Sequence, residues 1–117
     1  MMFIIFKGTH FFAIFASMVK HIILWTLRQD LTPDQKTEIK AGIKAGLEGL
    51  AGKIPGLVSI RVNTQGLPSS NADLMLDSSF ESFEALKAYS VHPAHVEVAD
   101  TKVRPFTAIR SCLDFEE

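Results

Sequence analysis

Cysteine, tryptophan and tyrosine each occur only once in this sequence of 117 residues, and its charges nearly cancel. One cysteine, Cys112, excludes an intramolecular disulfide and is typical of a reducing compartment, so we predict a cytoplasmic location. We expect Cys112 itself to be a small, buried or half-buried strand residue. The formal net charge of -1, without any cluster of Lys and Arg, argues against a nucleic-acid partner.

Several catalytic and binding motifs are also missing. The sequence has no Gly-rich phosphate loop, no G-x-S-x-G nucleophile elbow and no pair of cysteines. These absences argue against nucleotide binding, hydrolase chemistry and structural zinc, and we predict no cofactor.

No apolar run reaches the roughly 20 residues that span a bilayer, so we predict no membrane partner. Residues 1–17 hold five of the nine phenylalanines and a single charged side chain, Lys7. They lack the basic start and the A-x-A end of a signal peptide. We interpret 1–17 as an apolar N-terminal extension that is dispensable for folding, as a start codon assigned too early would produce. The alternative is a short apolar arm that packs on the domain or on a partner subunit.

The remaining residues, 18–117, have the composition and length of one globular domain. Thr32-Pro33-Asp34-Gln35 predicts a helix start, with Thr as N-cap, Pro at the first helical position and Gln three residues after the cap. Gly42, Gly46 and Gly49 are unfavourable within this helix, and we expect close backbone packing on a sheet to offset them. The predicted elements are strands at 19–28, 57–65, 72–79 and 106–115, and helices at 33–51, 82–90 and 93–102.

This β-α-β-β-α-β order predicts an α+β, ferredoxin-like βαββαβ sandwich, the split βαβ arrangement. The first strand is apolar on both faces, because Ile22 and Leu24 lie opposite the odd-numbered residues Val19 to Leu27. Helices can cover only one of these faces. A second copy of the sheet is the simplest cover for the other. We therefore predict a homodimer through Ile22 and Leu24, in which two subunits form a dimeric α/β-barrel.

Proton-transfer groups are concentrated in residues 80–95, where a tyrosine and two histidines fall within seven residues. Tyr89, His92 and His95 have a structural interpretation: His92 caps a helix, His95 closes the same turn, and Tyr89 packs in the core. In the alternative, functional interpretation, these residues are the polar contacts of a small-molecule pocket. His92 and His95 also have metal-ligand spacing, but no third ligand is evident, and we predict no metal site.

Two segments resemble the stress-responsive A/B barrel (Dabb) family: the strand opening Met18-Val19-Lys20-His21-Ile22-Ile23-Leu24, and the F-x-S-x-E-x-L-x-x-Y-x-x-H-P-x-H pattern of residues 80–95. The resemblance spans 18–117 and implies the dimeric barrel. The family includes a plant polyketide cyclase. The resemblance aligns the acid–base Tyr and His of that enzyme with Tyr89 and His95, and an additional pocket histidine with His21. Leu74 stands where that enzyme has another pocket histidine, which puts the cyclisation itself in doubt.

Two functions follow as hypotheses. The first is a stress-associated homodimer with an apolar pocket for a ligand of unknown identity. The second is a cofactor-free enzyme acting on an apolar, oxygen-bearing substrate, with Tyr89 and His95 as its acid–base pair. In both, the predicted ligand-binding residues are His21, Trp25, Leu27, Phe83, Leu86 and His92.

Overall fold

A computed structural model describes residues 18–117, so the predicted extension at 1–17 lies outside the described residues. The predicted β-α-β-β-α-β order and the ferredoxin-like fold are confirmed. In chain order the elements are β1 (Val19–Leu27), α1 (Pro33–Glu48), β2 (Leu57–Asn63), β3 (Leu74–Phe80), α2 (Phe83–Val91), α3 (Pro93–Val98), the π-helical turn η1 (Ala99–Val103), the 3-10 turn η2 (Arg104–Phe106) and β4 (Thr107–Glu116).

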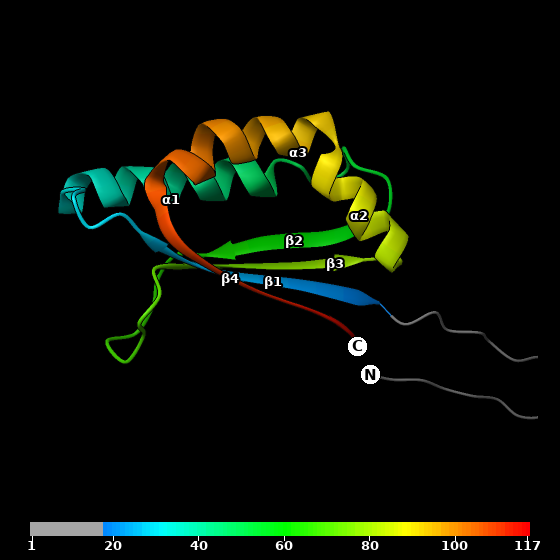
Figure 1. The fold of residues 1–117 in the computed structure, drawn as a ribbon, viewed down its shortest axis with the longest axis horizontal. Helices are drawn as coiled ribbons and strands as arrows, with labels where there is room; N and C mark the ends of the chain where they lie inside the picture. The colour runs from blue at the N-terminus through cyan, green and yellow to red at the C-terminus, as the bar shows by residue number, and fades with distance from the viewer. Residues whose placement is uncertain (1–17) are drawn as a thin grey trace, which may run out of the picture.

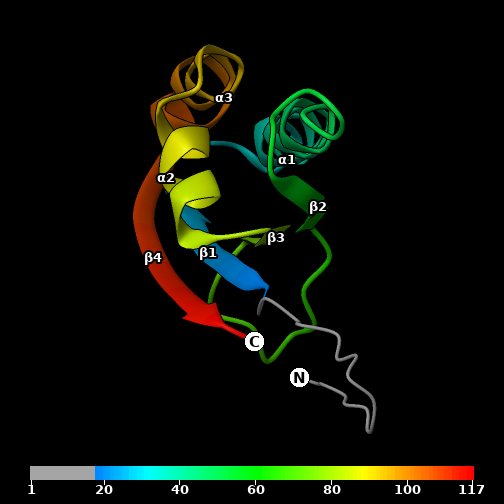
Figure 2. The ribbon, with the colours of Figure 1, turned by 90° about the vertical axis from the view of Figure 1, so that its right-hand side faces the viewer.

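The four strands form one antiparallel sheet in the order β2-β3-β1-β4. Helices α1, α2 and α3 all lie on one side of it, with α1 above β2 and α2 and α3 above the other half (Figures 1 and 2). We call this covered side the inner face. No helix or strand within residues 18–117 covers the opposite, outer face, and the loop between β2 and β3 lies on that side, near Leu24. No helix in this part of the chain is long and apolar enough to cross a membrane.

The predicted start of α1 is confirmed in detail. The Thr32 side chain accepts a hydrogen bond from the backbone N–H of Gln35, and the Gln35 side chain accepts one from the Thr32 N–H. This capping box satisfies two of the backbone donors that a helix start leaves without partners. It fixes where the helix begins, and from there Ile43 and Leu47 reach the core.

The core fills the space between the inner face and the helices. Its buried apolar members are Val19, Ile23, Trp25, Leu27, Ile43, Leu47, Leu50, Ile54, Ile60, Val62, Leu74, Leu76, Phe80, Leu86, Tyr89 and Val103. Gly46 lets α1 approach α3, because a Cβ there would lie 2.9 Å from Cγ1 of Val98. We expected the glycines of α1 to allow close packing on the sheet, but at Gly46 the close neighbour is a helix.

The spacing of Phe83, Leu86 and Tyr89 along the helix predicts that all three side chains are buried, and for Phe83 this prediction is wrong. Phe83 is 52% exposed, and only Leu86 and Tyr89 are buried on α2. A step of three residues falls about 60° short of a full helical turn. Two such steps place Phe83 about 120° away from Tyr89 around the helix axis. At the surface, the Phe83 ring contacts the Lys87 ammonium group, whose nitrogen is 5.1 Å from the ring centroid.

The prediction that Cys112 is buried or half-buried is also wrong, because the structure leaves it exposed. Its strand, β4, is at the edge of the sheet and pairs with β1 only. The helices cover the middle of the inner face but leave this edge open to solvent (Figure 2). The side chains on the inner face of β4 are therefore free to form a site.

Candidate functional site

A cavity of about 160 Å³ lies between the inner face of the sheet and the segment from α2 to η2. A cavity of about 150 Å³ is enough for benzene, so this one has room for a single ring or a short chain. Its apolar wall consists of Ile23, Trp25, Leu47, Leu76, Ala99 and Val103. Its polar lining consists of His21, Tyr89, Ser90, His95, Arg104, Thr107 and Arg110.

The cavity wall includes a π-helical turn. Turn η1 continues α3 and contributes Ala99 and Val103 to the lining. Such turns are rare and are often found at functional sites. The following turn, η2, contributes Arg104 to the lining, and the chain then enters β4 (Figure 1).

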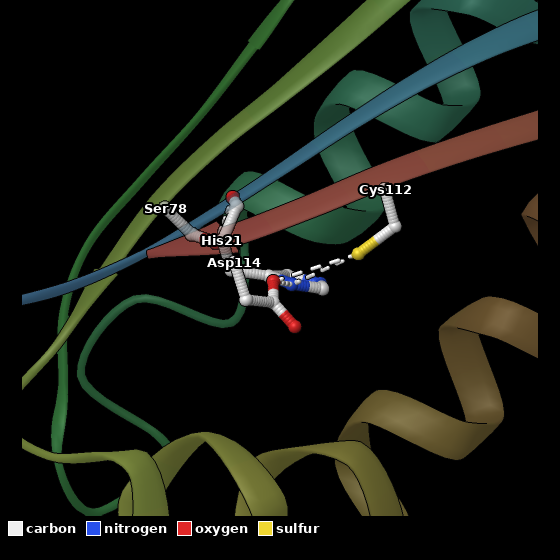
Figure 3. Close-up of polar contacts among 4 residues, drawn as sticks. All are labelled: His21, Ser78, Cys112 and Asp114. Carbon is white, nitrogen blue, oxygen red and sulfur yellow. Dashed lines mark hydrogen bonds and ion pairs between the residues drawn. The ribbon is translucent and has the colours of Figure 1, made fainter. Parts of the chain in front are cut away.

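His21, the third residue of β1, is buried and lines the cavity. The register places it directly opposite Asp114 on β4. The two side chains meet with 2.5 Å between His21 Nδ1 and Asp114 Oδ1, and Ser78 on β3 donates a hydrogen bond to the His21 carbonyl (Figure 3). A carboxylate only accepts, so Nδ1 carries the proton and the ring orientation is fixed.

Tyr89 comes from the buried side of α2, and its ring packs on Phe80, His21 and His95. Burial raises the pKa of its phenol far above the ordinary value, so the hydroxyl stays protonated. Within the described chain, Tyr89 Oη is buried and has no hydrogen-bond partner. Buried hydroxyls are normally satisfied, so this group beside the cavity is a candidate partner for a polar ligand atom.

His95 lies on α3, with its ring centroid 4.2 Å from that of Tyr89. The two rings are in contact at a tilt of 37°, but no hydrogen bond joins them. His95 Nδ1 lies 3.2 Å from the carbonyl oxygen of Ser90, which can only accept, so Nδ1 is the donor. Burial lowers the pKa of His95, and the nearby positive charge of Arg104 adds to this. A neutral His95 therefore has an unprotonated Nε2.

Two cations at the cavity were not predicted from the sequence. Arg104 pairs with Asp100 one helical turn earlier, while Arg110 forms no ion pair within residues 18–117. The spacing of two residues between Arg110, Cys112 and Asp114 places all three on one face of β4, and this spacing is visible in the sequence. Their position beside His21 depends on how β4 pairs with β1, and no local signal gives that register.

The structure brings His21, Trp25, Tyr89 and His95 to one cavity, but it places the other predicted ligand-binding residues elsewhere. Leu27 and Leu86 are core residues outside the lining, and Phe83 is at the surface. His92 Nδ1 accepts a hydrogen bond from the Ala94 N–H, so His92 is the N-cap of α3, the structural alternative. Leu74 is buried outside this cavity.

Comparison with known proteins places this fold among dimeric ferredoxin-like proteins. A solved dimeric protein of unknown function from Bacteroides fragilis is 31% identical, with a TM-score of 0.82 over 89% of this chain and 100% of the other. A Dabb family protein from Mesorhizobium loti is 18% identical, with a TM-score of 0.65 over 85% and 95%. The hydroxynitrile lyase from Passiflora edulis is 18% identical, with a TM-score of 0.66 over 87% and 94%.

No curated protein matches the sequence. The family model of the stress responsive A/B barrel domain matches residues 19–117, which is nearly the whole described chain. The chain therefore belongs to the stress-responsive A/B barrel (Dabb) family.

Proposed function

We propose that the protein is a homodimer that binds a small, largely apolar molecule with an oxygen-bearing group in the cavity beneath α2 and η1. The observation that carries this proposal is the buried hydroxyl of Tyr89, which has no hydrogen-bond partner among the described residues, in a wall with both apolar and polar residues. Small-molecule sites combine an apolar surface with polar groups that orient the ligand, and the six apolar lining residues supply that surface here. His21 and His95 supply further polar contacts, and Arg110 favours a ligand with an acidic group.

The homodimer part of the proposal is supported by the outer face of the sheet. The even-numbered residues of β1 and the odd-numbered residues of β4 share this face, because Ile22 lies opposite Leu113. Its large apolar residues Leu24, Ile109, Leu113 and Phe115 are between 41% and 64% exposed in one subunit. An exposed patch of this kind marks an interaction site. A second copy offers the same patch, as isologous dimers require.

Sedimentation velocity of the full chain at micromolar concentration tests the assembly. The expected result is a single species with the mass of two chains. A chain that begins at Met18 serves as the control and is expected to behave identically. A monomer for the full chain would rule out the homodimer, and a monomer for the shortened chain alone would show that residues 1–17 contribute to the assembly.

Ligand binding is tested by a thermal-shift screen of phenols and aromatic or aliphatic carboxylic acids, with a chelator present. A hit is expected to bind at least about fivefold more weakly to Tyr89→Phe, because a hydrogen bond to the hydroxyl is worth about 1 kcal/mol or more. The variant should lose no stability, since it removes only an unsatisfied buried group. Phe83→Ala, on the exposed side of the same helix, is the control and should bind normally.

Two outcomes would contradict this use of the cavity. One is a ligand that binds equally well to the unmodified protein and to Tyr89→Phe. The other is a loss of several kcal/mol of stability in Tyr89→Phe, which would make the hydroxyl a structural tether.

A second candidate function is acid–base catalysis without a cofactor, and it is favoured by the state of His95. Its Nδ1 donates to Ser90, and burial lowers its pKa, so Nε2 is available as a base at neutral pH. Tyr89, kept protonated by its raised pKa, is the matching acid. Solvent deuterium exchange into a 1,3-dicarbonyl compound, followed by NMR, tests this. His95→Ala should slow the exchange by about 10²–10⁴-fold; equal rates would exclude the catalytic role.

A further inference from the structure

Three different metal-binding side chains meet at the open edge of the inner face. His21 comes from β1, and Cys112 and Asp114 come from β4, where a spacing of two residues puts both on one side of the strand. One donor atom from each residue lies within 4.8 Å of the other two (Figure 3). This convergence exists only in the folded chain, because more than 90 residues separate His21 from Asp114.

The distances among the donors are close to those of a tetrahedral zinc site. Bond lengths of about 2.0–2.2 Å to nitrogen or oxygen and about 2.3 Å to sulfur imply donor separations of about 3.3 Å for N–O and about 3.6 Å for S–N or S–O. Cys112 Sγ lies 3.9 Å from His21 Nδ1 and 3.5 Å from Asp114 Oδ1. Only the pair His21 Nδ1 and Asp114 Oδ1, at 2.5 Å, must separate, by somewhat less than 1 Å.

The surroundings support this ligand set. His21 is held from behind by the core, and its side chain is 11% exposed, so its position is defined before any ion binds. Asp114 is 36% exposed at the open edge, which gives an ion a path from solvent. A thiolate and a carboxylate together neutralise a divalent cation, and imidazole, thiolate and carboxylate are the usual ligands of zinc.

We propose that His21, Cys112 and Asp114 bind one divalent transition-metal ion of the zinc class through Nδ1, Sγ and Oδ1. Three protein ligands leave a fourth position of the tetrahedron for water or a small ligand, which is the arrangement of open zinc sites. The site is separate from the contact between Tyr89 and His95, although His21 borders both.

Two features of the protein without metal oppose the ion and can be measured. Metal binding requires the thiolate of Cys112 and an unprotonated Nδ1 on His21, so the ion must displace the thiol proton and the ring proton of His21 must move to Nε2. Arg110 lies on the same face of β4, two residues before Cys112, and its positive charge repels a cation. Arg110→Gln is therefore expected to bind the metal a few-fold more tightly, which a purely hydrogen-bonded cluster would not do.

Titration of the reduced full chain with Co²⁺ tests the proposal. Because Cys112 is the only cysteine in the sequence, a thiolate-to-cobalt charge-transfer band can arise from no other residue. The expected result is one Co²⁺ per chain with this band, and displacement of the cobalt by an equivalent of Zn²⁺.

The variants are chosen at exposed positions, so that they fold. Cys112→Ser should lose the band. Asp114→Asn should bind Co²⁺ at least about tenfold more weakly, since even the groups that hydrogen-bond to metal ligands contribute 10–100-fold to metal affinity. Glu116→Gln removes the next carboxylate on the same face of β4 and should bind like the unmodified protein.

Cobalt binding without the band, or with equal affinity in Asp114→Asn, would overturn the proposal. His21 and Asp114 would then form only a hydrogen-bonded pair. The ligand screen of the cavity is run with chelator, so it can succeed or fail independently of the metal.

Discussion

Strand β1 has two apolar faces, and they are buried to different extents in the same subunit. On the inner face, Ile23 and Leu27 are each 1% exposed beneath the helices. On the outer face, Leu24 is 42% exposed, and Ile22 beside it is only half-buried. The residues are chemically alike, so their difference in burial comes from the helices alone. An apolar strand face is part of the core only if another element covers it.

The two faces also differ in where their paired polar side chains lie. On the outer face, Lys20 pairs with Asp77 across β1 and β3, with 2.6 Å between Nζ and Oδ1, on the more polar half of the sheet. On the inner face, His21 and Asp114 are gathered at the edge that the helices leave open. The first pair lies on the face that no helix covers, whereas the second lies beside a cavity. Polar groups become a candidate site where partial cover brings them together without removing solvent.

The largest expected effect comes from placing a charge on the outer face. In the proposed homodimer, Leu24→Lys would bury an unpaired ammonium group in each subunit, at a cost on the order of 3–5 kcal/mol per group. Sedimentation velocity should show monomers, or the protein should unfold. Ser59→Lys, on the polar half of the same face, is the matched control and should remain dimeric. A stable dimer of Leu24→Lys would place the subunit interface elsewhere.

Truncating neighbouring isoleucines compares the two faces directly. Ile23→Ala removes fully buried methyl groups and should lower the free energy of unfolding by about 2–5 kcal/mol. Ile22→Ala, on the other face, should cost clearly less at low protein concentration, where the dimer dissociates, and more as concentration rises. Urea denaturation at two protein concentrations measures both. Equal costs at every concentration would show that the outer face is not an interface.

The smallest effect is on the pH dependence of stability, and it arises from the cavity on the inner face. Burial lowers the pKa of His95 in the folded protein, so the unfolded chain binds a proton there more readily. Stability should therefore fall as pH drops through about 6.5, the ordinary pKa of histidine, towards the lower folded value. His95→Gln should flatten this slope, as measured by thermal melts at fixed protein concentration. Parallel curves for the two proteins would mean that His95 is not desolvated.

Local patterns predicted the elements of this fold because their causes are local. The Thr32 cap and Pro33 mark the start of α1, and the alternation of β1 separates Ile22 from Ile23. The candidate site was predictable only in part. The rings of Tyr89 and His95, which are close in sequence, are in contact at the cavity, whereas the Phe83 side chain is at the surface because of its angle around α2.

The sequence by itself determined the order of strands and helices, the helix caps and the two faces of β1, since these depend on backbone preferences and side-chain spacing over a few residues. Only the tertiary structure decided which face the helices cover, and that Asp114 and Cys112 lie beside His21. The reason is physical. The register of two strands more than 90 residues apart is set by the packing of the whole sheet, so no short segment contains it.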